Sequence, residues 1–120
     1  MSSLGPDIED IRPLTPMQEY MLFQHELDPS DHRYRQQAVV GLEGALDDAV
    51  MTEAVRSLAR AHDALRTVYL QRNLSSPAQV VVASLAPSVD VADDTGQGLD
   101  AILEAELARG FELSARPPIR

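Results

Sequence analysis

The chain has 120 residues, 44% of them hydrophobic, and its 19 acidic side chains outnumber 10 basic ones for a formal net charge of −9. This length and composition suit a single buried core, while the acidity argues against nucleic acid as a partner. The chain has no cysteine, and His25, His32 and His62 share no ligand-like spacing, which argues against disulfides and a structural metal site.

The first predicted helix covers residues 16–27. Thr15 is a favoured N-cap residue, and Pro16 suits the first helical position because its missing N–H would lack a partner there. Gln18 completes a Thr-x-x-Gln capping box. The helix should end before Pro29, because the residue that precedes a proline is disfavoured in the helical conformation.

A strand is predicted next, over residues 34–43. Ala38, Val40 and Leu42 share one face, and the opposite face is also at least half apolar. A strand that is apolar on both faces is typical of the interior of a sheet. We therefore expect a central strand.

A long helix should follow, from the N-cap residue Asp47 to about Arg66, because apolar residues recur at spacings of three and four. The stripe that they form comprises Met51, Val55, Leu58, His62 and Leu65. His62 lies within this stripe. We therefore expect its imidazole in the core, with the ring nitrogens hydrogen-bonded.

The second half of the chain predicts a hairpin of residues 67–72 and 78–84, a short strand over residues 88–91, and a helix over residues 99–109 that Gly110 ends. This alternation predicts an α/β or α+β sandwich, with helices on one face of a mixed sheet. Residues 1–7 are expected to be flexible. They form no basic, apolar leader, and no run is long enough to span a membrane, so we expect a soluble, cytoplasmic protein.

The first helix has more apolar surface than one buried face requires. Tyr20, Phe23 and Leu27 form one line along it, and Met17 and Met21 form another. Two interpretations stay open. Either the helix is sandwiched within the fold, or one apolar line faces a partner.

Two short motifs, in this order, give the chain a family resemblance. The first is Leu-Thr-Pro-Met-Gln at residues 14–18, followed by Met-Leu-Phe at 21–23, and the second is Ala-His-Asp-Ala-Leu-Arg-Thr-Val-Tyr at 61–69. Together they resemble the opening motifs of the condensation domains of nonribosomal peptide synthetases. Weaker matches fall in the family's order at residues 8–11, where its first strand lies, and at 42–47 and 111–113. The resemblance covers nearly the whole chain.

The resemblance implies a fold of two lobes like that of chloramphenicol acetyltransferase, with residues 1–120 forming the leading part of the first lobe. It implies amide formation between acyl or peptidyl and aminoacyl thioesters, which carrier proteins present on phosphopantetheine arms. The implied partners are carrier protein domains, an adenylation domain and the remainder of the condensation domain, and no cofactor is bound directly. The family's catalytic histidine pair lies further along than residue 120, and no two histidines adjoin in this chain. We therefore assign no catalytic residue and expect the chain alone to be inert.

Within the motifs, the resemblance assigns a mainly structural role to nine residues, Thr15, Pro16, Met17, Gln18, His62, Asp63, Leu65, Arg66 and Thr67. It makes Tyr20, Phe23 and Leu27 candidates for contact with the acceptor carrier protein. The spacing of Asp63 and Arg66 indicates an ordinary surface ion pair.

Departures from the family pattern at Tyr20, Ala61 and Asp63 leave the subtype open. Two alternatives to a peptide-forming domain therefore remain. One is an epimerisation or ester-forming relative on the same fold, and the other is a non-catalytic fragment that contacts a carrier or another partner.

Overall fold

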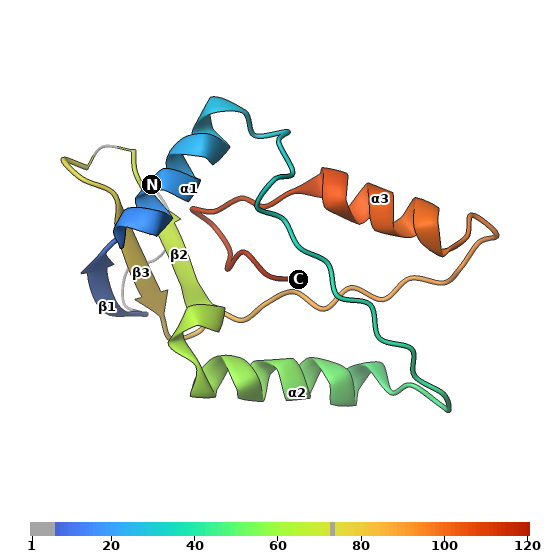
Figure 1. Ribbon diagram of the computed structural model, residues 1–120. Coiled ribbons are helices and arrows are strands. Elements are labelled where there is room, and N and C mark those ends of the chain that lie inside the picture. Colours follow the sequence, from blue (N-terminus) through green and yellow to red (C-terminus); the bar gives the residue numbers. More distant parts are fainter. Residues whose placement is uncertain (1–6, 73) are drawn as a thin grey trace.

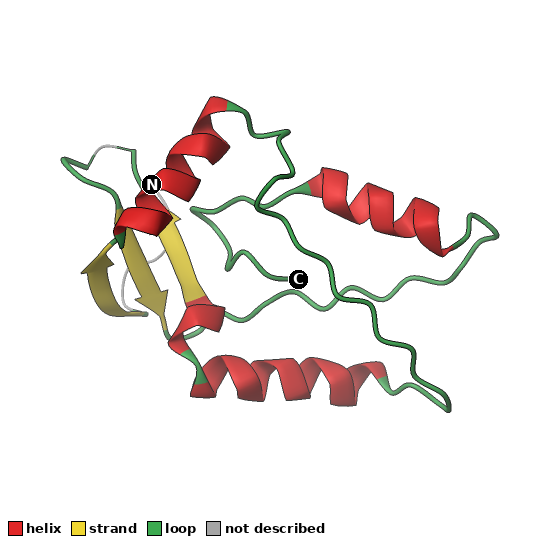
Figure 2. Cartoon of the chain, viewed as in Figure 1, coloured by secondary structure: helices red, strands yellow, loops and turns green. Residues whose placement is uncertain are grey.

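The computed structural model describes residues 7–72 and 74–120. Its elements are β1 (Ile8–Pro13), α1 (Pro16–Leu27), α2 (Asp48–Ala61), the 3-10 turn η1 (Asp63–Arg66), β2 (Thr67–Leu70), β3 (Ala78–Val82) and α3 (Leu99–Arg109) (Figures 1 and 2). Among the described residues, no helix is both long and apolar enough to cross a membrane. The flexibility expected of residues 1–6 falls outside the described part. Asp7 lies inside it, and its carbonyl accepts the Ala83 N–H at 2.8 Å.

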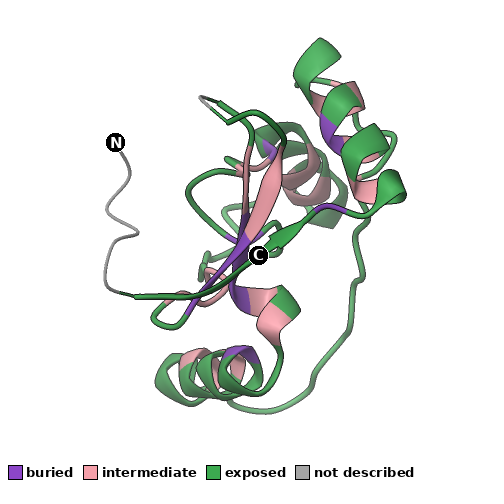
Figure 3. Cartoon of the chain, turned by 90° about the vertical axis from the view of Figure 1, so that its left-hand side faces the viewer, coloured by how far each residue is buried: buried purple, intermediate pink, exposed green. Residues whose placement is uncertain are grey.

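The three strands form an antiparallel sheet in the order β1-β3-β2. The hairpin of β2 and β3 confirms the prediction, with Val68 opposite Val80 and Leu70 opposite Ala78. Two other expectations were wrong. Within the described residues the sheet is antiparallel rather than mixed, and α1 and α2 lie at its opposite ends instead of together on one face (Figures 1 and 3).

The small core lies on the central strand. Val68, Val80 and Val82 are buried together, with Leu70 and Leu85 packed against them. Val81, whose side chain lies on the other face of the strand, is also buried, so both faces of β3 carry buried side chains. Valine suits these positions because its branched side chain is restricted in a way that favours strands.

The predicted strand over residues 34–43 does not form, and neither does the one over residues 88–91. The first segment runs past α3, where the Arg35 guanidinium donates to the Leu107 carbonyl and the Gln37 amide donates to the Leu103 carbonyl, both at 2.8 Å. A strand requires a neighbour with free backbone groups. The Tyr69 N–H, on the outer edge of β2, instead donates to the Leu113 carbonyl at 2.8 Å.

Helix α2 ends earlier than its apolar stripe predicts. The stripe continues to Leu65, but the backbone leaves the helical region at His62 (φ −131°, ψ 110°) and the chain continues as η1. The carbonyls of the last helical turn then lack partners within the helix. One of them, on Ala59, accepts a hydrogen bond from the Arg66 side chain at 2.9 Å, which stabilises this early end.

Helix α3 ends at Gly110, as predicted. Gly110 has φ 66° and ψ −164°, a conformation that is essentially restricted to glycine. Two guanidinium groups cap this end, because Arg35 binds the Leu107 carbonyl and Arg120 binds those of Glu106 and Gly110. Positive charge is favourable here, at the negative end of the helix dipole.

We predict that Gly110→Ala lowers the free energy of unfolding by about 1–3 kcal/mol, because a side chain cannot adopt this backbone conformation without strain. The added Cβ would also approach within 2.8 Å of the Arg35 guanidinium. Gly41→Ala is the matched control, because nothing lies within 4 Å of its Cβ position and its φ is not positive. Urea unfolding followed by circular dichroism measures both variants, and equal stabilities would contradict the prediction.

Candidate functional site

The first motif forms the N-terminus of α1. The Thr15 hydroxyl accepts the Gln18 N–H at 3.2 Å, and the Gln18 side-chain carbonyl accepts the Thr15 N–H at 2.8 Å, so the predicted capping box is confirmed. Pro16 occupies the first turn as expected, and Met17 is exposed. Leu14, just before the cap, is buried and anchors the chain where it leaves β1.

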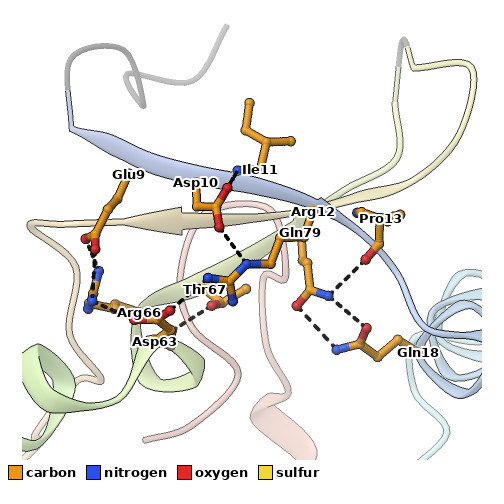
Figure 4. A network of polar contacts seen from close by, with 10 residues as sticks. All are labelled: Glu9, Asp10, Ile11, Arg12, Pro13, Gln18, Asp63, Arg66, Thr67 and Gln79. Carbon is orange, nitrogen blue, oxygen red and sulfur yellow. Dashed lines mark hydrogen bonds and ion pairs between the residues drawn. The ribbon is translucent and has the colours of Figure 1, made fainter.

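Gln18 also connects this cap to the sheet. The Gln79 amide nitrogen on β3 donates to the Gln18 side-chain carbonyl at 3.1 Å and to the Pro13 backbone carbonyl at 3.0 Å (Figure 4). Tyr69 lies opposite Gln79 on β2. Burial raises the pKa of the Tyr69 phenol, while the neighbouring Gln18 side chain acts in the opposite direction.

The second motif is organised around Arg66, whose guanidinium is buried with only 6% of the residue exposed. It forms ion pairs with Glu9 of β1 and with Asp63, the latter at 2.7 Å, and it donates to the Ala59 carbonyl at 2.9 Å. The expected pairing with Asp63 is present, but its description as an ordinary surface pair was wrong. A buried arginine with three polar partners joins β1, η1 and the end of α2 (Figure 4).

Arg12 extends this cluster toward solvent. Its guanidinium lies 3.0 Å from the Asp63 carboxylate and 2.6 Å from that of Asp10. The hydrogen bond from Arg12 lowers the pKa of Asp10. These outer side chains are exposed, so water screens their charges and the pairs contribute little to stability.

The remaining motif residues differ in their surroundings. Thr67 is buried and its hydroxyl donates to the Asp63 carbonyl at 2.6 Å, while Leu65 is half-buried. His62 is exposed, so the expectation of a core histidine was wrong. The helix ends just before His62, which carries the ring away from the apolar stripe, and Ala59 takes the buried position instead.

The apolar line of α1 faces solvent. Tyr20, Phe23 and Leu27 are 49%, 55% and 65% exposed, and the helix buries only Leu22. Tyr20 packs edge-on against Tyr34, with 6.2 Å between the ring centroids. Within the described residues no other helix or strand covers this line, and both interpretations of the helix stay open.

A cavity of about 560 Å³ opens beside α1. Gln18, Met21 and His25 of α1 line it together with Tyr34, Tyr69 and the tail residues Phe111 and Leu113. Among the described residues, no group of three or more histidine, aspartate and glutamate side chains is arranged to hold a metal ion. The site therefore consists of an exposed apolar line on α1 and a framework of polar contacts centred on Gln79 and Arg66.

Two residues of this framework, Glu9 and Gln79, were not among the sequence candidates. Gln79 interrupts a run of apolar residues on β3, and a lone amide among valines is a signal that it bonds to something specific. Glu9 gave no comparable signal. Its partner Arg66 lies 57 residues away, and no local pattern connects them.

Comparison with known proteins shows the family in which this framework occurs. The profile of the family described as the condensation domain matches residues 8–120, which include both motifs and both of their partners on the sheet. The chain belongs to the condensation domain family. It is 38% identical over 88 residues to a linear gramicidin synthase protein of Brevibacillus parabrevis, and 40% identical over 86 residues to surfactin synthase subunit 2 of Bacillus subtilis.

These two alignments cover 73% and 72% of the chain but 2% of each relative. Surfactin synthase subunit 3 of Bacillus subtilis is 30% identical over 128 residues, which cover all of the chain and 10% of that protein. The chain thus spans a small fraction of the length of these relatives. The family resemblance in the two motifs is confirmed.

We predict that Arg66→Ala lowers the free energy of unfolding by about 1.5–3 kcal/mol, the range for hydrogen bonds to charged groups that are lost from a buried site. Arg60→Ala is the matched control. Arg60, also on the α2 side of this region, pairs with Glu53 at 2.8 Å, but both side chains are exposed, so its loss should change stability by less than about 1 kcal/mol. Chemical denaturation measures the free energy of unfolding of both variants. Equal decreases would show that the buried Arg66 stabilises the chain no more than an exposed arginine does.

Proposed function

We propose that this chain contributes the leading part of the first lobe of a two-lobed condensation domain that forms amide bonds. The match of residues 8–120 to the family profile carries the proposal. In such a reaction the amine of an aminoacyl thioester attacks the carbonyl carbon of an acyl or peptidyl thioester. The C–N bond forms, the C–S bond breaks, and the nitrogen loses a proton as the sulfur leaves as a thiol.

The substrates would be carried on the phosphopantetheine arms of carrier proteins, with an adenylation domain supplying the activated amino acid. The names of the relatives, synthases of linear gramicidin, surfactin and tyrocidine, support this assignment. Holding two tethered thioesters together supplies most of what the reaction needs, because proximity replaces a bimolecular encounter.

The role of the described residues in this function is support and docking. Arg66 and Gln79 hold the two motifs to one sheet. The exposed Tyr20, Phe23 and Leu27 would contact the acceptor carrier protein. Exposed aromatic side chains with an adjacent apolar residue are common anchors of protein interfaces. The carrier would contact α1 along this line.

The chain exposes many apolar side chains, which supports the proposal that the rest of the condensation domain packs against it. The Cα radius of gyration is 16.1 Å, compared with roughly 13–14 Å for a compact domain of this length. Val39, Val40 and Leu42 are exposed along the unpaired segment, and Val50 and Leu58 along α2. The remainder of the condensation domain would cover these side chains.

The 120-residue chain by itself should not form peptide bonds. It has no adjacent histidine pair, and His62, the histidine in the second motif, is an exposed helix cap. Incubation with a donor and an acceptor, each loaded on its carrier protein, should give no dipeptide above the level without the chain. Product that disappears in a folded His62→Ala variant would overturn this expectation.

Docking on α1 predicts that Phe23→Ala in the complete domain raises the KM for the acceptor carrier protein, while the free energy of unfolding changes by less than about 0.5 kcal/mol. Phe23 is the better probe because Tyr20 also packs against Tyr34. Leu99→Ala is the control, since Leu99 is 56% exposed but lies on α3. Steady-state kinetics with separate carrier proteins measure the effect, and equal KM values for the two variants would exclude docking on this line.

A further inference from the structure

We infer that Gln79 is a positioning residue that sets the orientation of α1 relative to the sheet. Its side chain forms a polar link between β3 and the N-terminus of this helix. The inference rests on that function only where it concerns the carrier protein. The link itself is a property of the described residues.

The chemistry of the partners fixes which atoms face one another. The Pro13 carbonyl can only accept a hydrogen bond, so the Gln79 atom 3.0 Å away is its amide nitrogen. The Thr15 backbone N–H can only donate, so the Gln18 atom 2.8 Å away is its carbonyl oxygen. The same Gln79 nitrogen then donates to this oxygen at 3.1 Å. One amide group thus binds both the last residue of β1, Pro13, and the capping box.

Gln79 is held firmly on its own side. It lies on the central strand, paired with Arg12 of β1 and with Tyr69 of β2, and the valines that follow it are buried. The Gln79 backbone is therefore held by hydrogen-bonded strands on both sides. A side chain that is anchored on such a strand can fix the orientation of the helix that it binds.

Helix α1, in contrast, has no extensive contact with another described helix or strand apart from this link, and Tyr20 packs edge-on against Tyr34 in the following loop. It buries only Leu22, and among the described elements the extensive contacts are those within the sheet and those of η1 with α2 and β3. With so little packing, the hydrogen bonds at its N-terminus carry a large share of its placement. The direction of the exposed line of Tyr20, Phe23 and Leu27 would follow from Gln79.

Three variants separate this link from general packing. Gln79→Met keeps the approximate size and removes both donations, and Gln79→Glu replaces the donor with an acceptor that faces two other acceptors. Gln18→Glu keeps an acceptor for both the Thr15 N–H and the Gln79 amide nitrogen. It gives up only the long 3.5 Å donation from the Gln18 amide nitrogen to the Gln79 side-chain carbonyl, so the shorter bonds of the link should be preserved. Gln71→Ala is the matched control, because Gln71 is exposed and its side chain forms no hydrogen bond within the described residues.

Residual dipolar couplings of backbone amides in the 120-residue chain report the orientation directly. In the parent chain, Gln18→Glu and Gln71→Ala, the couplings of α1 and of the three strands should fit one alignment frame. In Gln79→Met and Gln79→Glu the couplings of α1 should no longer fit the frame of the strands, while the strands still fit among themselves. The Thr15 amide should exchange roughly 2- to 10-fold faster, because its acceptor, the Gln18 side-chain carbonyl, loses the hydrogen bond from Gln79 that holds it in place. An unchanged common fit in both Gln79 variants would overturn the inference.

The consequence for docking is measured in a complete domain carrying the same substitutions. Gln79→Met should raise the KM for the acceptor carrier protein by roughly 2- to 10-fold with kcat nearly unchanged, and Gln18→Glu should leave this KM at the parent value. If Gln79→Met reorients α1 but leaves this KM unchanged while Phe23→Ala raises it, Gln79 does not position the docking surface. If Phe23→Ala also has no effect, the docking proposal fails, and the dipolar couplings still decide whether Gln79 orients the helix.

Discussion

The buried guanidinium of Arg66 is the interaction on which the arrangement of this chain depends. It lies where α2 has ended, η1 turns and β1 passes, and it binds a group from each of them through Ala59, Asp63 and Glu9. Burying an arginine is unfavourable unless its charge and its donors find partners. Because those partners come from three elements, the favourable state exists only when all three are in place. The strand after η1 therefore begins in a defined position.

Strand β3 then connects this junction to the start of α1. Gln79 near one end of the strand holds the capping box, while Val81, further along, pairs with Thr67 next to Arg66. Both family motifs are thus fixed to one central strand, although neither motif lies on it (Figure 4). This explains how polar side chains from separate elements form one framework. A strand of regular geometry sets the distance between two separate hydrogen-bonded junctions.

Local chemistry predicted most of the elements, and long-range contacts account for the errors. The capping box at Thr15 and Gln18, the hairpin of β2 and β3, and the end of α3 at Gly110 depend on residues close in sequence, and all were found. The early end of α2 was missed because the apolar stripe continues through it, whereas the Arg66 side chain folds back to the Ala59 carbonyl and stabilises this end. The ion pair of Arg66 with Glu9 could not be predicted, because nothing local connects two residues 57 positions apart.

The unpaired segment over residues 34–43 and the exposed line of α1 have a common physical origin. Each has the local pattern of a buried element, but burial needs a second surface, and the described residues supply none for Val40 or Phe23. Covering one such side chain fully contributes about 1.5–3 kcal/mol, and a domain as a whole is stable by only about 5–15 kcal/mol. A few such contacts therefore amount to a large share of the stability of a domain. The pattern of residues 34–43 is therefore a strand preference that pairing and packing within the described residues do not realise.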